Sequence, residues 1–119
     1  MSTIKVDTIK NTSNVEVFTA KAWVNFDGTT NTGGSCTIRA SGNVTSVTDN
    51  GTGDYTINFT TAMTDANYSS LFTNGELNTS YWGPIPYIYS QATASVRVRS
   101  VFATGSFSDA SSCNVIVFR

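Results

Sequence analysis

Hydrophobic and polar residues alternate with a period of two along most of this chain. The clearest case is residues 55–60, where Tyr55, Ile57 and Phe59 alternate with polar side chains. Strict alternation over four to eight residues is typical of a β-strand that buries one face. Extended structure is likewise predicted over residues 20–27, 36–40, 44–48, 68–73, 87–89, 94–99 and 113–118. No segment favours an amphipathic helix longer than a single turn.

Clusters of Gly, Asn, Asp and Thr separate these predicted strands. The sharpest is Asp-Asn-Gly-Thr-Gly-Asp at residues 49–54, which predicts a hairpin over residues 44–60, because Asn-Gly readily adopts positive φ. Residues 28–35 are polar and rich in glycine, and we expect a loop there. About eight to ten short strands, with turns roughly every 8–12 residues, predict an all-β fold, an antiparallel β-sandwich of the jelly-roll kind.

The beginning of the chain differs from the remainder. Val15 and Val17 alternate after a cluster of Asn, Thr and Ser, but the segment has too few apolar residues to form a core of its own. We therefore divide the chain into an extended arm, residues 1–19, and a β-sandwich domain, residues 20–119. Such an arm needs a neighbour to pack on, so it is a candidate for attachment to other proteins or for exchange between subunits. Its candidate attachment residues are Ile4, Val6 and Ile9.

Two predicted strands carry large apolar side chains on both faces. Trp23 lies on the nominally polar face of its strand, and Ile116 and Phe118 oppose two valines in the last strand. A strand that is apolar on both faces fits a central position in a sheet or burial between subunits. Trp23, Ile116 and Phe118 are therefore the candidate subunit interface.

Composition narrows the classes of partner. The chain has 119 residues, which fits one domain with a modest core. Only 13% of residues are charged and the net charge is −1, so no basic field exists to hold nucleic acid or an anionic membrane. No apolar run approaches the ~20 residues that span a bilayer, and the N-terminus lacks the apolar core of a signal peptide. We expect neither nucleic acid binding nor membrane insertion.

The residues that usually carry catalysis are scarce. The chain contains no histidine, which removes the usual general base and a frequent metal ligand, and we expect no cofactor and no metal. Asp49 and Asp54 flank one turn, as a glycosidase pair could, but turn aspartates more often bind their own backbone. We therefore expect a protein that is not an enzyme. Cys36 and Cys113 form either one disulfide or two separate thiols, and the second alternative is favoured.

Aromatic side chains gather around two prolines in residues 81–89. Flat exposed rings stack on the apolar faces of sugar rings, whereas buried ones would plug the end of the sandwich or a seam between subunits. Two arginines share one face of the strand at residues 94–99; they form either a solvated or ion-paired surface or a contact with an anionic glycan. The candidate glycan contacts are Tyr81, Trp82, Tyr87, Tyr89, Arg97 and Arg99.

Several segments resemble a recurrent module of tail-fibre and fibre-like virion proteins of bacteriophages, frequent in marine phages. The resemblance is specific over residues 20–68, moderate at both ends of the chain and absent from residues 69–86. It is carried by AWVNF at 22–26, IRAS at 38–41, TDNGTGDYTINFTTAM at 48–63 and DANY at 65–68, with similar flanks at 5–10 and 114–118.

The resemblance implies a β-sandwich that trimerises at the distal end of a fibre. On this basis we expect a homotrimeric structural protein on the virion surface, a short fibre or fibre tip. Its partners would be itself, other virion proteins and a host surface glycan, with residues 28–35 and 73–89 as contact loops. The alternative is a capsid decoration protein that clamps neighbouring capsomers through its N-terminal arm and binds no receptor. A glycan-cleaving depolymerase is disfavoured by the short chain.

Overall fold

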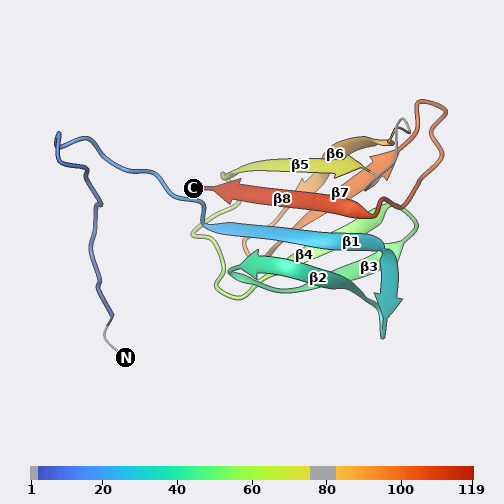
Figure 1. Ribbon diagram of the computed structural model, residues 1–119, viewed down its shortest axis with the longest axis horizontal. Helices are drawn as coiled ribbons and strands as arrows, with labels where there is room; N and C mark the ends of the chain where they lie inside the picture. Colours follow the sequence, from blue (N-terminus) through green and yellow to red (C-terminus); the bar gives the residue numbers. More distant parts are fainter. Residues whose placement is uncertain (1–2, 76–82) are drawn as a thin grey trace.

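The chain folds into β-strands joined by short turns (Figure 1). The computed structural model describes residues 3–75 and 83–119, and within these ranges it contains eight strands and no helix. The all-β prediction is confirmed. The strands are β1 (Ala22–Thr32), β2 (Ser35–Gly42), β3 (Val44–Gly51), β4 (Asp54–Phe59), β5 (Ser69–Gly75), β6 (Ile85–Gln91), β7 (Ser95–Val101) and β8 (Ser112–Phe118).

All neighbouring strands are antiparallel, in the order β5-β8-β1-β2-β3-β4-β7-β6. One junction is weak, because β2 and β3 are joined only at the pair Ser35–Thr48, whereas every other neighbouring pair is joined over several residues. The junction divides the sheet into two groups of four strands. We call β5, β8, β1 and β2 the β8 half, and β3, β4, β7 and β6 the β7 half. In Figure 1, β8 and β1 lie in front of β7 and β4.

The two edge strands, β5 and β6, nearly close the sheet on itself. Side chains bridge them: Ser70 Oγ donates to Gln91 Oε1 at 2.5 Å, and Gln91 Nε2 donates to the carbonyl of Tyr68 at 2.9 Å. β6 contains Pro86, which has no amide hydrogen to give to a further strand, so its place at an edge is the one that proline tolerates.

The core lies inside this nearly closed sheet and uses the inward-facing residue of every second position. Phe26 and Tyr55 meet edge to face, with ring centroids 5.2 Å apart. Burial of each large apolar side chain stabilises the fold by about 1.5–3 kcal/mol. The inward faces predicted from alternation are confirmed for β1, β4 and β7, while β8, which is apolar on both faces in the sequence, turns its valines inward. The buried side chains of these four strands include Ala22, Val24, Phe26, Tyr55, Ile57, Phe59, Val96, Val98, Val115 and Val117.

The prediction of a loop over residues 28–35 is wrong. β1 runs on to Thr32 and β2 begins at Ser35, so only Gly33 and Gly34 form the turn, both with positive φ. These residues are polar because the end of the β1–β2 hairpin is largely exposed, and backbone pairing makes them strand. The polar composition of residues 28–35 therefore reflects their exposure to solvent and does not indicate a loop.

The hairpin predicted over residues 44–60 is confirmed as β3 and β4, but its turn is centred two residues later than expected. Gly51 pairs with Asp54, which leaves Thr52 and Gly53 as the turn. Gly53 has a φ of 62° and its amide donates to Asp109 Oδ1 at 2.7 Å. A Cβ at this position would come within 2.7 Å of a backbone oxygen. The turn that precedes Asp54 therefore requires glycine at position 53.

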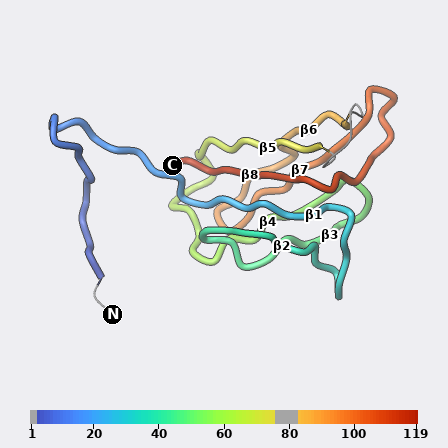
Figure 2. The backbone as a smooth tube through the Cα atoms, viewed as in Figure 1, coloured from blue at the N-terminus to red at the C-terminus, as the bar shows by residue number. Residues whose placement is uncertain are grey.

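Residues 3–20 lie outside the sheet and project from it (Figure 2). They turn back near their middle, where Lys10 pairs with Glu16 and the amide of Val17 donates to the carbonyl of Ile9 at 2.6 Å. A cleft of about 350 Å³ lies between this arm and the end of β8. Every described residue up to position 20 is exposed, including Ile4, Val6 and Ile9.

Both cysteines are buried free thiols. Cys36 and Cys113 are the second residues of β2 and β8. Burial raises the pKa of each thiol to about 12, so both stay protonated at neutral pH. The sequence left open one disulfide or two separate thiols, and the structure has two separate thiols.

Candidate functional site

The outer surface of β4, β7 and β6 gathers charged and aromatic side chains from three strands. In the register, Asp54 on β4 lies opposite Arg99 on β7, which lies opposite Tyr87 on β6. We call this surface the Arg–aromatic face. It brings together four of the six predicted glycan contacts, while Tyr81 and Trp82 lie outside the described residues. Its members are Asp54, Tyr87, Tyr89, Arg97, Arg99 and Phe107.

One carboxylate holds both arginines in place. Arg97 donates to Asp54 through Nε and Nη2, each at 2.8 Å, and Arg99 Nε donates to the same carboxylate at 3.1 Å. These hydrogen bonds, that of Arg97 above all, hold the pKa of Asp54 below its ordinary value. The arginines are thus ion-paired, and the group retains one positive charge in excess.

A β-bulge in β6 aims an aromatic ring at these arginines. Ile88 pairs with Val98 and Ser90 with Arg97, so the intervening Tyr89 has no partner on β7. Bulges often re-aim a side chain in this way. The guanidinium carbon of Arg99 lies 3.4 Å from the centroid of the Tyr89 ring, and Arg97 lies 5.2 Å from it.

A second ring, which the sequence did not single out, also approaches Arg99. Phe107 pairs with Val101 in an isolated bridge, and its ring centroid lies 5.6 Å from the guanidinium carbon of Arg99. The residues around Phe107 have no alternation that would have placed it on this surface. Asp54 was noticed only as part of a turn, and its pairing with two arginines depends on strands about forty residues apart.

The outer surface of β5, β8 and β1 is apolar by contrast. Leu71 lies opposite Ile116, and Ile116 lies opposite Trp23, so three large apolar side chains form a row across three strands. Phe118 is two residues further along the same face of β8. We call Trp23, Leu71, Ile116 and Phe118 the apolar face; all four are exposed, Leu71 by 62%. It unites the three predicted interface residues, and alternation around Phe72 could have found the fourth.

Trp23 leans over Gly42 on the neighbouring strand, to which it is paired. A Cβ at Gly42 would lie 2.9 Å from Cδ1 of the indole ring. The missing side chain therefore leaves the space that the ring occupies.

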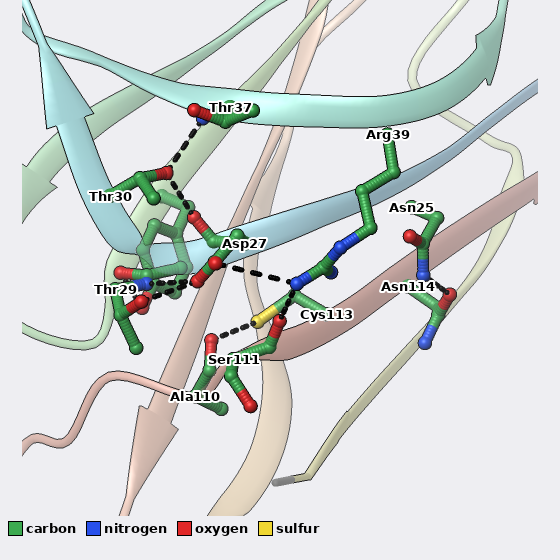
Figure 3. Close-up of polar contacts among 12 residues, drawn as sticks. Asn25, Asp27, Thr29, Thr30, Thr37, Arg39, Ala110, Ser111, Cys113 and Asn114 are labelled. Carbon is green, nitrogen blue, oxygen red and sulfur yellow. Dashed lines mark hydrogen bonds and ion pairs between the residues drawn. The ribbon is translucent and has the colours of Figure 1, made fainter. Parts of the chain in front are cut away.

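The remaining outer surface of the β8 half is polar and internally paired (Figure 3). Asn25 Nδ2 donates to Asn114 Oδ1 at 2.6 Å, and Arg39 Nη2 lies 3.4 Å from the carboxylate of Asp27. Burial raises the pKa of Asp27, but hydrogen bonds from Thr29 and the charge of Arg39 outweigh it and leave the pKa below its ordinary value.

The two turn aspartates have different partners. Asp49 Oδ1 accepts from the amide of Gly51 at 2.9 Å, which is the backbone bond expected of a turn aspartate, and Oδ2 accepts from Asn31 at 2.9 Å. Asp54 is engaged by the arginines. In the part of the chain that the structure describes, no cluster of three or more His, Cys, Asp or Glu could hold a metal ion. Within the same residues, no helix is long and apolar enough to cross a membrane.

Comparison of the chain with protein-family models, curated proteins and solved structures finds no match. The evidence for its function therefore lies in the two outer faces and the arm.

Proposed function

We propose that this protein is a non-enzymatic, glycan-binding protein displayed on a bacteriophage virion as a short fibre or fibre tip. The observation that carries the proposal is the Arg–aromatic face, where rings and guanidinium groups lie together on an exposed sheet surface. Rings stack on the apolar faces of sugars, and guanidinium groups donate hydrogen bonds to sugar oxygens. The resemblance of residues 20–68 to phage fibre modules supplies the setting on the virion.

In this proposal the domain is a β-sandwich of the jelly-roll kind that assembles as a homotrimer. The single residue pair between β2 and β3 supports two packed sheets rather than one continuous barrel. The apolar face supports assembly, because a row of large exposed apolar side chains across three strands is typical of an interaction surface. Trp23, Ile116 and Phe118 would lie in the seam, together with Leu71.

The arm would attach the protein to other virion proteins. Its apolar side chains have little to pack on in the described structure; Ile4 is 88% exposed. Val6 and Ile9 line the cleft beside the end of β8, so a partner strand entering there would contact both the arm and the domain.

The test is a virion that lacks this protein. If it contacts host glycans, we expect the adsorption rate to fall about tenfold. Supplying the wild-type protein should restore adsorption, whereas supplying Tyr89→Leu should not. Arg39→Gln, on the β8 half, is the matched control and should restore adsorption. Normal adsorption of virions without the protein would overturn the glycan-binding role.

A capsid decoration protein is the second candidate, and the exposed apolar arm is the observation that favours it. In that case virions without the protein would adsorb normally but lose infectivity on heating or osmotic shock. Deletion of residues 2–19 would have the same effect. Labelled antibody bound to the head rather than the tail would decide for this alternative.

A further inference from the structure

We propose that the Arg–aromatic face binds an acidic sugar, one that bears a carboxylate, in preference to a neutral glycan. This inference rests on the proposed function and names the ligand class of the same site. The face is defined above by Asp54, the two arginines and the rings beside them.

The first argument is charge. One carboxylate, Asp54, faces two guanidinium groups, so the cluster carries one uncompensated positive charge. Among the described residues, no other carboxylate forms an ion pair with either arginine: Asp49 accepts from Gly51 and Asn31, and Asp109 accepts from the Tyr55 hydroxyl at 2.8 Å and from the turn amide. A bound monoanion would balance the cluster.

The second argument is the supply of donors. A guanidinium group has five N–H donors and no acceptor. Arg97 binds Asp54 through Nε and Nη2, and its Nη1 has no hydrogen-bond partner among the described residues. The Arg97 side chain is 36% exposed, so this nitrogen is within reach of a ligand. Planar carboxylates are matched to guanidinium donors, as the bond to Asp54 already illustrates.

The third argument is rigidity. The arginine head groups are held by Asp54, and Arg99 is stacked on Tyr89 and close to Phe107. A ligand that binds a fixed guanidinium does not have to overcome the entropy of ordering a free arginine side chain. Exposed arginines without such support gain little from an anion.

The fourth argument is the neighbouring ring. Tyr89 is 50% exposed although Arg99 lies over its ring, so part of the residue remains accessible to a ligand. The guanidinium carbon of Arg97 lies 5.2 Å from the centroid of the same ring, so one saccharide can contact both the ring and the guanidinium group. A free inorganic anion would gain only the charge, and a neutral sugar only the stacking. An acidic sugar gains both.

The experiment measures binding of the whole protein to matched pairs of saccharides by titration calorimetry. The acidic probes are tetragalacturonic acid and sialyllactose, and their neutral partners are the methyl ester of the first and lactose. We expect the acidic member of at least one pair to bind about tenfold more tightly. The preference should weaken between about 0.05 M and about 0.5 M salt, because exposed charges are screened.

Variants locate the site. Arg97→Gln should abolish the preference for the acidic member, since it removes the free donors while Asp54 keeps its bond to Arg99. Tyr89→Leu should weaken both members of the pair. Arg39→Gln is the control and should change neither. Thermal unfolding of each variant is compared with that of the wild type. If either Arg97→Gln or Tyr89→Leu fails to fold, the remaining variant and the salt dependence of the wild type still test the proposal.

The outcomes separate the two proposals. Equal binding of acidic and neutral members overturns the ligand class and leaves glycan binding standing. If the protein binds none of the saccharides but its loss impairs adsorption, only the acidic-sugar proposal is overturned. Absence of both binding and an adsorption defect overturns both proposals. Tighter binding of a sulfated disaccharide than of either carboxylate would overturn the carboxylate assignment, and an acidic preference that survives Arg97→Gln would overturn the site.

Discussion

The two outer faces of this sheet differ although the strands beneath them are built alike. β7 and β8 both turn valines inward, to the same core. Outward, β7 carries Arg97 and Arg99, which are paired with Asp54 and stacked on a ring. β8 turns Ile116 and Phe118 outward, where Trp23 and Leu71 extend the apolar surface. The inward residues determine that the strands form a sheet, and the outward residues determine what the sheet contacts.

The faces also differ in what they lack. The apolar face carries no charged side chain, and cover from another apolar surface would stabilise its exposed area. The Arg–aromatic face is internally paired and stable in water, yet retains a charge and free donors. The apolar face is therefore suited to a permanent interface, and the Arg–aromatic face to a ligand that binds reversibly.

The largest expected effect is on assembly. Ile116→Lys places a charge in the middle of the apolar face, and burying it between subunits would be costly. We expect light scattering to show wild-type protein at about three times 12.7 kDa and this variant at the monomer mass. Tyr87→Lys, on the opposite face, is the control and should remain trimeric. A wild-type protein that is itself monomeric would contradict the assignment of the apolar face to a subunit seam.

The next effect is on stability and concerns the ion pairs. Asp54→Ala removes the one carboxylate among the described residues that pairs with these two guanidinium groups, so we expect the free energy of unfolding to fall by about 1–3 kcal/mol. Arg39→Gln removes a single, longer ion pair on the other half and should cost less than about 1 kcal/mol. Urea denaturation measures both. Equal losses would show that the Arg–aromatic face is no better organised than an ordinary charged surface.

A smaller effect is expected where Trp23 leans over Gly42. Gly42→Ala pushes the indole ring outward, at a cost of about 1 kcal/mol or less, because an exposed ring can move. The change should shift the fluorescence of Trp23. Gly75→Ala, where an added Cβ meets nothing within 4 Å, is the matched control and should leave the spectrum unchanged. Identical spectra for the two variants would mean that Trp23 does not occupy this space.

The smallest effect is the dependence of stability on pH. The pKa of Asp54 is lower in the folded protein than its ordinary value of 3.8, so the unfolded chain binds this proton more readily. The stabilisation is complete above about pH 4 and is lost as the pH falls through the folded pKa. Asp54→Asn should therefore lose less stability than wild type between about pH 6 and about pH 3 in thermal unfolding. Parallel curves would show that the arginines do not act on this carboxyl.

Much of the fold could be predicted from local pattern. Alternation correctly identified the inward residues around Ile57 and Val98, because a half-buried strand must place apolar residues at every second position. Pro86 lies within the edge strand β6, whereas extended structure was predicted to begin only at residue 87. The misjudged segment, residues 28–35, is strand despite its polar composition, because hydrogen bonds to a neighbouring strand do not depend on side-chain polarity.

The candidate site could be predicted only in part. Arg97 and Arg99 were placed on one face of a strand, but Tyr89 was not placed beside them. Their meeting depends on the pairing of β6 with β7 and on the bulge at Tyr89, and Asp54 joins them only because β4 pairs with β7. Phe107 had no local signal.

The sequence by itself determined the strands and their inward faces, because both follow from residues close together in the chain. It also determined the kinds of side chain available outside. Only the tertiary structure decided which of these lie side by side: Leu71 with Ile116 and Trp23, and Asp54 with two arginines. Strand order is set by contacts between distant residues, and a period of two within each strand says nothing about which strand lies next to it.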